Sequence, residues 1–164
     1  MVHEAARLVD LFDLQPHPEG GYFKEFYRSP DDILLPQFSG PRSCATSIYF
    51  LLEQGQFSAL HRIKSDEVWH FYLGDPLEIV EIDPSGEWKS TILGHQITLG
   101  QQLSYVVKAG NWFGSRPLQG SAYSLVGCSV SPGFDFQDFE MPSRGYFERE
   151  FPNLKTKFQE VTRF

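Results

Sequence analysis

The sequence is short of cysteine and of positive charge, and each shortage excludes a class of protein. Only two of its 164 residues are cysteines, Cys44 and Cys128, too few and too far apart for a disulfide framework. Fourteen Lys and Arg residues stand against 21 Asp and Glu residues, for a formal net charge of −7, and the basic residues form no cluster. A nucleic-acid-binding surface and attraction to anionic membranes are therefore disfavoured.

Long apolar runs are also missing. No stretch approaches the roughly 20 apolar residues that a membrane-spanning helix needs. The first 14 residues carry Glu4, Asp10 and Asp13 among their apolar side chains, unlike the apolar region of a signal peptide. Together with the reduced thiols that so few cysteines suggest, this predicts a cytoplasmic protein with neither a membrane nor a nucleic-acid partner.

Aromatic residues are abundant, at 15% of the chain, and 15 of them are Phe. Because aromatic residues favour strands and line apolar cavities, this excess indicates an all-β fold around a pocket. Before the strands, residues 4–14 place Ala5, Leu8, Leu11 and Phe12 three or four apart, which predicts a short amphipathic helix. The prolines and glycines that follow end this helix.

The middle of the chain has the pattern of many short strands. Glycine, proline and aspartate separate these strands at short intervals, which is typical of a barrel or sandwich. We expect strands at residues 22–29, 45–53, 57–62, 67–73, 77–83, 88–93, 103–108, around 112–113, and at 122–131. Residues 143–163 have a polar, helical pattern interrupted at Pro152. The prediction is one domain over residues 1–164, with the barrel at about 20–140.

Two residues six positions apart, His61 and Glu67, are the first candidates for chemistry. They flank a short turn, so two adjacent strands can aim both side chains into one cavity. Imidazole and carboxylate together offer either two metal ligands or a base with its orienting partner. Strand alternation places Trp69 on the same face as Glu67 and places His70 on the opposite face.

The same stretch, FSALHRIKSDEVWHFYLG, resembles the first motif of the cupin superfamily, G-x5-H-x-H-x3,4-E-x6-G. His61 matches the first His, Glu67 the Glu and Gly74 the closing Gly, whereas Ile63 stands where the second His is expected. The second cupin motif, G-x5-P-x-G-x2-H-x3-N, is matched only in outline, and Phe113 occupies the position of its metal-binding His. The sequence thus keeps two of the four usual metal ligands.

Four longer strings extend the resemblance over about residues 5–150: HPEGGYFKEFYRS, ATSIYFLL, SDEVWHFYLGDPLEI and VGCSVSPGFDFQDFE. They are similar to a branch of single-domain cupins catalogued as a domain of unknown function. The resemblance implies an all-β, RmlC-like jelly-roll barrel, the double-stranded β-helix, with a short N-terminal helix and a helical C-terminal segment. It also implies a homodimer, but no established reaction.

Three functions remain open, all built on a small molecule bound in the cavity. In a metal-independent epimerase or isomerase acting on a sugar-like substrate, His61 is the general base, oriented by Glu67 or another carboxylate, and Tyr49 or Tyr22 returns the proton. In a metal-dependent oxygenase or isomerase, His61, Glu67 and His70 hold a divalent ion. The third is a non-catalytic binding or sensing module. The expected ligand-binding residues are Tyr22, Glu25, Ser47, Trp69, Phe71, Trp112 and Phe113.

Strand alternation leads to two further expectations. Strict alternation over residues 22–29 places Arg28 on the face opposite Glu25. In the strand at residues 67–73, Val68, His70 and Tyr72 share the face turned away from the cavity. We expect this second face to form the dimer interface.

Overall fold

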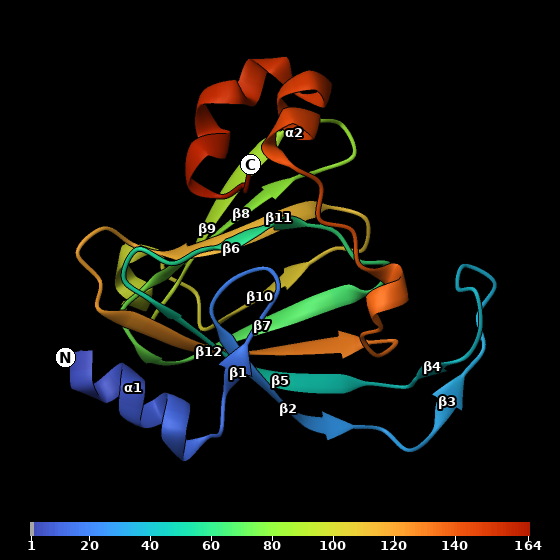
Figure 1. Cartoon of the computed structure of the whole chain (residues 1–164), viewed down its shortest axis with the longest axis horizontal. Helices are drawn as coiled ribbons and strands as arrows, with labels where there is room; N and C mark the ends of the chain where they lie inside the picture. The colour runs from blue at the N-terminus through green and yellow to red at the C-terminus, as the bar shows by residue number, and fades with distance from the viewer. Residues whose placement is uncertain (1) are drawn as a thin grey trace.

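The computed structural model describes residues 2–164, and most of its regular structure is strand (Figure 1). One large and one small antiparallel sheet pack face to face, which makes the fold an all-β jelly roll. In chain order the elements are α1 (Val2–Leu11), β1 (Gln15–Pro16), β2 (Tyr22–Arg28), β3 (Asp32–Ile33), β4 (Arg42–Ser43), β5 (Thr46–Glu53), β6 (Ser58–His61), β7 (Asp66–Gly74), β8 (Leu77–Ile82), β9 (Trp88–Leu93), η1 (Ile97–Leu99), β10 (Ser104–Val107), β11 (Trp112–Pro117), β12 (Tyr123–Ser131), η2 (Phe136–Asp138), α2 (Arg144–Glu150) and η3 (Pro152–Glu160).

The strand order explains how distant parts of the chain meet. The large sheet runs β1-β2-β5-β12-β7-β10 and the small sheet runs β6-β11-β8-β9. The longest pairing joins β12 to both β5 and β7, so residues near position 128 lie between residues near positions 48 and 69. A third, two-stranded sheet of β3 and β4 extends away from the body of the molecule (Figure 1).

The main core fills the space between the two sheets. Its members alternate along their strands, as period-two side-chain placement requires: in β7 Glu67, Trp69 and Phe71 are buried, while Val68 and His70 are partly exposed. Phe50 and Phe113 pack edge to face against Trp69 from the two sheets. This core closes one end of the interior, and the other end remains open as a cavity.

Helices cover the outer face of the small sheet and one end of the large sheet. The C-terminal helices α2 and η3 lie over the small sheet, where Trp112 packs 5.2 Å from Phe147 between ring centroids (Figure 1). Helix α1 lies against one end of the large sheet through Ala5, Leu8 and Val9. Leu11, which the helical pattern placed on the buried face, is 74% exposed, so that part of the prediction is wrong. No helix among residues 2–164 is long and apolar enough to cross a membrane.

Candidate functional site

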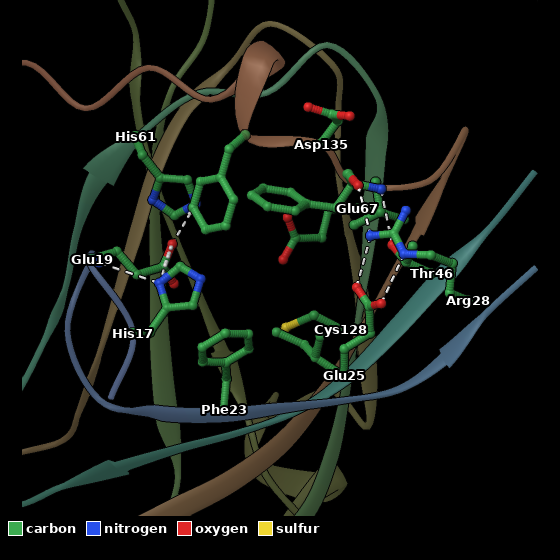
Figure 2. Close-up of a pocket in the computed structure, with 14 residues that line it drawn as sticks. His17, Glu19, Phe23, Glu25, Arg28, Thr46, His61, Glu67, Cys128 and Asp135 are labelled. Atoms are coloured by element: carbon green, nitrogen blue, oxygen red, sulfur yellow. Dashed lines mark hydrogen bonds and ion pairs between the residues drawn. The ribbon is translucent and has the colours of Figure 1, made fainter. Parts of the chain in front are cut away.

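A cavity of about 310 Å³ opens between the two sheets at the end away from the aromatic core. Strands of both sheets line it, together with the turn between β1 and β2 and the loop after β12. The lining residues are His17, Glu19, Phe23, Glu25, Arg28, Thr46, Ile48, His61, Glu67, Cys128, Val130, Phe134, Asp135 and Phe136. Figure 2 shows His17, Glu19 and His61 grouped on one side and Glu25 and Arg28 on the other, with Glu67 and Cys128 between them.

The turn between β1 and β2 carries Glu19 into the cavity wall. Gly20 has φ = +120°, and a Cβ added there would overlap the carbonyl oxygen of Phe57. Only glycine therefore allows the turn to lie this close to the chain before β6. The backbone carbonyl of Glu19 accepts a hydrogen bond from the Ala59 N–H at 2.8 Å, and the side-chain Oε1 of Glu19 accepts one from Ser58 Oγ at 2.9 Å.

His61 is 3% exposed, and both of its ring nitrogens face protein oxygens. Its Nδ1 lies 2.8 Å from the carbonyl oxygen of Ala59, which can only accept, so Nδ1 carries a proton and donates. Burial lowers the pKa of His61 to about 4, so the ring is neutral at pH 7 and Nε2 carries a lone pair. That lone pair faces Oε2 of Glu19 at 3.1 Å.

A single proton between Glu19 and His61 satisfies both groups. Burial raises the pKa of Glu19, which favours the protonated carboxyl, and an Oε2–H group can then donate to Nε2 of His61. His17 lies on the other side of Glu19, and its Nδ1 accepts the Glu19 backbone N–H at 3.2 Å. Burial also lowers the pKa of His17, whose Nδ1 lies 3.6 Å from Oε2 of Glu19, so three titratable side chains lie together on this side of the cavity.

Glu67 is the second proton-holding group in the cavity. It is 7% exposed, and no N–H or O–H group of residues 2–164 donates to its carboxyl; the thiol of Cys128, a weak donor, lies beside it. Burial, followed by the charge of Glu19, raises the pKa of Glu67 to about 8. At pH 7 Glu67 is therefore mostly a neutral acid.

Cys128 shares this wall. Burial, together with the carboxyl of Glu67, raises the pKa of its thiol well above the usual value, so the thiolate is disfavoured. Cys128 thus contributes volume and a weak donor to the wall rather than a nucleophile.

A β-bulge brings Arg28 into the cavity beside Glu25. The register between β2 and β5 shifts between Glu25 and Tyr27, so the alternation expected for residues 22–29 breaks at that point. The prediction that Arg28 faces away from Glu25 is therefore wrong. The Arg28 guanidinium binds both carboxylate oxygens of Glu25, at 2.8 and 2.9 Å, and also donates to the Phe134 carbonyl at 3.1 Å.

The loop after β12 supplies an aromatic wall. Phe134 and Phe136 pack edge to face at 4.9 Å, and Phe136 stacks on His17 at 6.2 Å. The loop is held by hydrogen bonds from Phe134 N to Thr46 Oγ1 and from Arg28 to the Phe134 carbonyl. Asp135 begins η2 by accepting from the Gln137 N–H, and it too lines the cavity.

Three of the residues singled out from the sequence meet in this cavity: His61, Glu67 and Glu25. Phe113 packs its ring 4.1 Å from the His61 ring, just outside the lining. Trp69 and Phe71 point the same way as Glu67 but lie deeper in the core, where they close the interior.

The remaining candidates lie outside the cavity. Because Thr46 and Ile48 face inward from β5, alternation turns Ser47 and Tyr49 to the outer face of the large sheet. Ser47 Oγ bonds Ser129 Oγ there, and Tyr49 packs against Phe12 and Phe26. The assignment of proton return to Tyr49 or Tyr22 is therefore corrected. Three further candidates also lie away from the cavity. Tyr22 packs beside α1, Trp112 lies under the C-terminal helices, and His70 lies on the outer face of β7.

His17, Glu19, Arg28 and the loop aromatics are absent from the candidates that the sequence pattern indicates. The string HPEGG is typical of a turn that ends a helix, and from the sequence alone we interpret it only in that way. It also places a His and a Glu two residues apart around a proline, and this spacing is the one feature of the string that could have indicated His17 and Glu19 as site residues. No local signal marks Arg28, because its position depends on the bulge.

The donor set does not fit a bound transition metal. Ile63 and Phe113 replace two of the ligands of the cupin pattern, and both are buried in the core. His70 lies on the outer face, and the two nitrogens of His61 already face Ala59 and Glu19. Accordingly, the described residues include no set of three His, Cys, Asp or Glu side chains arranged for a metal ion. Transition-metal sites usually need three or four protein ligands.

Comparisons with known proteins agree with this architecture. Residues 6–142 match the family model described as "Cupin superfamily (DUF985)". A solved structure from Shewanella oneidensis is 38% identical, with a TM-score of 0.89 and 97% of each chain covered. A hypothetical protein from Leishmania major is 33% identical, with a TM-score of 0.90, and the match covers 98% of this chain and 99% of that one. An uncharacterized protein of Saccharomyces cerevisiae is 29% identical over 144 residues, 80% of this chain and 72% of the yeast protein.

Proposed function

Since the chain belongs to the cupin superfamily, in the family described as DUF985, we propose that it is a metal-independent acid–base enzyme. Its reaction belongs to the epimerase or isomerase class, and its substrate is a small, polar, sugar-like molecule. One observation carries the proposal: the buried Glu19–His61 couple, with 3.1 Å between Oε2 and Nε2, shares one cavity with the buried acid Glu67. Inversion or isomerisation at carbon requires a proton acceptor and a proton donor in a single site.

The two groups have complementary roles. When the shared proton moves from Glu19 to Nε2 of His61, the Glu19 carboxylate can take a proton from a substrate carbon next to a carbonyl. The C–H electron pair then becomes part of an enolate, and Glu67 donates its own proton to a neighbouring atom or to the other side of the same carbon. The couple ends with one proton more and Glu67 with one fewer, so the net charge of the cavity is unchanged, and exchange with solvent restores the starting state.

Glu67 replaces the tyrosines as the proton donor in this scheme. A carboxyl with a pKa of about 8 is protonated at neutral pH and still releases its proton readily, as a general acid requires. Tyr49 and Tyr22, by contrast, are separated from the cavity by the sheet itself. Ser58 supports the base by donating to Oε1 of Glu19, which leaves Oε2 to His61.

Solvent exchange tests the proposal whichever product the reaction forms. The protein is incubated in D₂O with a panel of aldoses, ketoses and nucleotide sugars, and proton NMR follows the loss of the C–H signal beside each carbonyl. We expect exchange with at least one compound, slowed by roughly 10²-fold or more in Glu19→Gln and Glu67→Gln, the size typical of a lost general acid or base. Glu140→Gln, an exposed carboxyl paired with Arg62 outside the cavity, is the matched control.

The result separates catalysis from simple binding. If a panel compound binds in the cavity but no compound exchanges, the cavity is a binding or sensing site and the acid–base proposal fails. If exchange persists unchanged in both carboxamide variants, other residues perform the chemistry.

The proposal includes a homodimer formed through the outer face of the large sheet. Tyr72 on β7 is 37% exposed, Val106 on the adjacent β10 is 41% exposed and Phe26 on β2, near the other edge of the sheet, is 49% exposed, so exposed apolar groups recur across this face. A charge at Tyr72 would lie against the second copy and weaken the dimer. Sedimentation analysis of Tyr72→Asp checks this, and a wild type that is monomeric at all concentrations would overturn it.

A further inference from the structure

We infer that the cavity accepts ligands whose enclosed part is uncharged, and that Glu25 enforces this selectivity by keeping Arg28 occupied. The inference deepens the proposed function, since it takes the same cavity as the substrate site and names the charge of what enters. It rests on the arrangement of the lining side chains, seen together in Figure 2.

Among the described residues, the lining of the cavity offers an anion no cation without a carboxylate partner. Of the lining residues that the structure describes, Arg28 alone is permanently positive, because burial keeps His17 and His61 neutral. Its Nε and one Nη bind the two oxygens of Glu25, and the same Nη donates to the Phe134 carbonyl. Bidentate pairing of this kind consumes the geometry with which arginine usually recognises carboxylates and phosphates.

A further acidic side chain adds to this barrier. Asp135 lines the cavity beside the same opening as Glu25. A carboxylate or phosphate entering the cavity would lose its hydration while facing these two acidic side chains, a desolvation that a paired arginine does not offset.

What the cavity does offer suits hydroxyl and carbonyl groups. The Glu67 carboxyl is more than nine-tenths buried and points into the cavity, and its one hydrogen-bonding partner among the described residues is the weak thiol of Cys128. Both its proton and its acceptor oxygen are therefore available to a ligand. The rings of Phe23, Phe134 and Phe136 supply an apolar wall for the carbon skeleton. This combination fits an uncharged polyol or hydroxycarbonyl compound.

Releasing Arg28 should reverse the selectivity. In Glu25→Gln the amide is neutral and cannot form the charged bidentate pair, which leaves the guanidinium free at the cavity wall. Acetate and inorganic phosphate serve as probes, with binding followed by NMR shifts of the Phe134 amide and of the His17 and His61 ring protons. We expect the dissociation constant for these anions to be lower by roughly tenfold or more in Glu25→Gln than in the wild type, because hydrogen bonds between charged groups are stronger than those between neutral groups.

Two further variants make the test specific. Glu25→Gln combined with Arg28→Gln should lose the gained binding, since the freed cation is gone. Glu140→Gln frees Arg62, an arginine in an exposed pair outside the cavity, and should leave these cavity resonances unmoved by anions.

Each outcome decides the inference. Anion binding gained in Glu25→Gln and lost in the double variant supports it. Equal anion binding by the wild type and Glu25→Gln overturns it, and so does an absence of anion binding in both. Because the experiment measures binding alone, a failure of the D₂O exchange experiment would bear on the proposed reaction and leave this result unaffected.

Discussion

Replacing Glu67 by Gln should remove a large pH-dependent loss of stability. The folded protein holds the proton of Glu67 up to a pKa of about 8, whereas the unfolded chain releases it near the ordinary glutamate pKa of 4.5. Below pH 4.5 Glu67 is protonated in both the folded and the unfolded state, so it gives the unfolding free energy no pH dependence there. As pH rises from 4.5 to 8 the unfolded state alone ionises, so the stability that the proton confers is lost through this window.

The magnitude follows from the size of the shift. Each unit of difference in pKa corresponds to about 1.4 kcal/mol, so between pH 5 and pH 9 the unfolding free energy of the wild type should fall by about 4 kcal/mol relative to that of Glu67→Gln. His61 acts in the opposite direction, because its pKa is lowered to about 4 and its contribution to stability is lost as pH falls below 6.5. The two trends offset one another below pH 6.5, so the decline in the wild type should emerge mainly between pH 6.5 and 8.

Urea denaturation at a series of pH values from 5 to 9 measures the effect. The relevant quantity is the difference in unfolding free energy between Glu67→Gln and the wild type at each pH, since the fixed cost of the substitution cancels from its slope. Glu140→Gln is the control, because it makes the same chemical change at an exposed carboxyl outside the cavity. A difference for Glu67→Gln that varies with pH no more than the control does would refute the view that this carboxyl is buried and neutral in the folded protein.

Three other substitutions test the support of the site and the covering of the small sheet. Gly20→Ala should cost on the order of 2 kcal/mol in urea denaturation, since its Cβ would overlap the Phe57 carbonyl at a positive φ. Ser58→Ala removes the donor to Glu19, so it should lower stability by about 1 kcal/mol and raise the carboxyl pKa further, as read by carbon NMR. Phe147→Ala, at a fully buried position of α2 that packs on the small sheet, should cost roughly 3–5 kcal/mol yet leave cavity resonances unchanged; large shifts at His61 would contradict this separation.

Local patterns predicted most of the secondary structure. Turn residues and period-two alternation act over a few positions, so the bounds of β7, β8 and β9 could be predicted to within one residue. The break in the C-terminal helical segment at Pro152 was likewise a local effect of proline. The short strands β1, β3 and β4 were missed, because two-residue pairings depend on their partners and leave no pattern of their own.

The residues of the site likewise fall into those that local patterns could predict and those that depend on packing. His61 and Glu67 share a cavity because a short turn and fixed alternation relate them, and both are local properties. Which face of a strand is buried is decided by what packs against it: alternation grouped Ser47 with Tyr49, but only the packing of α1 and the cavity shows that they face outward.

Tertiary structure alone decided the rest of the site. The bulge in β2 turned Arg28 inward, and the close passage of Gly20 over Phe57 brought Glu19 to His61 across 42 positions of sequence. The burial that keeps Glu67 protonated and His61 neutral is likewise a property of the closed barrel. The sequence determined the strands and two of the acid–base residues, whereas folding determined their protonation states and partners, because charge and hydrogen bonding in a cavity depend on every wall that surrounds it.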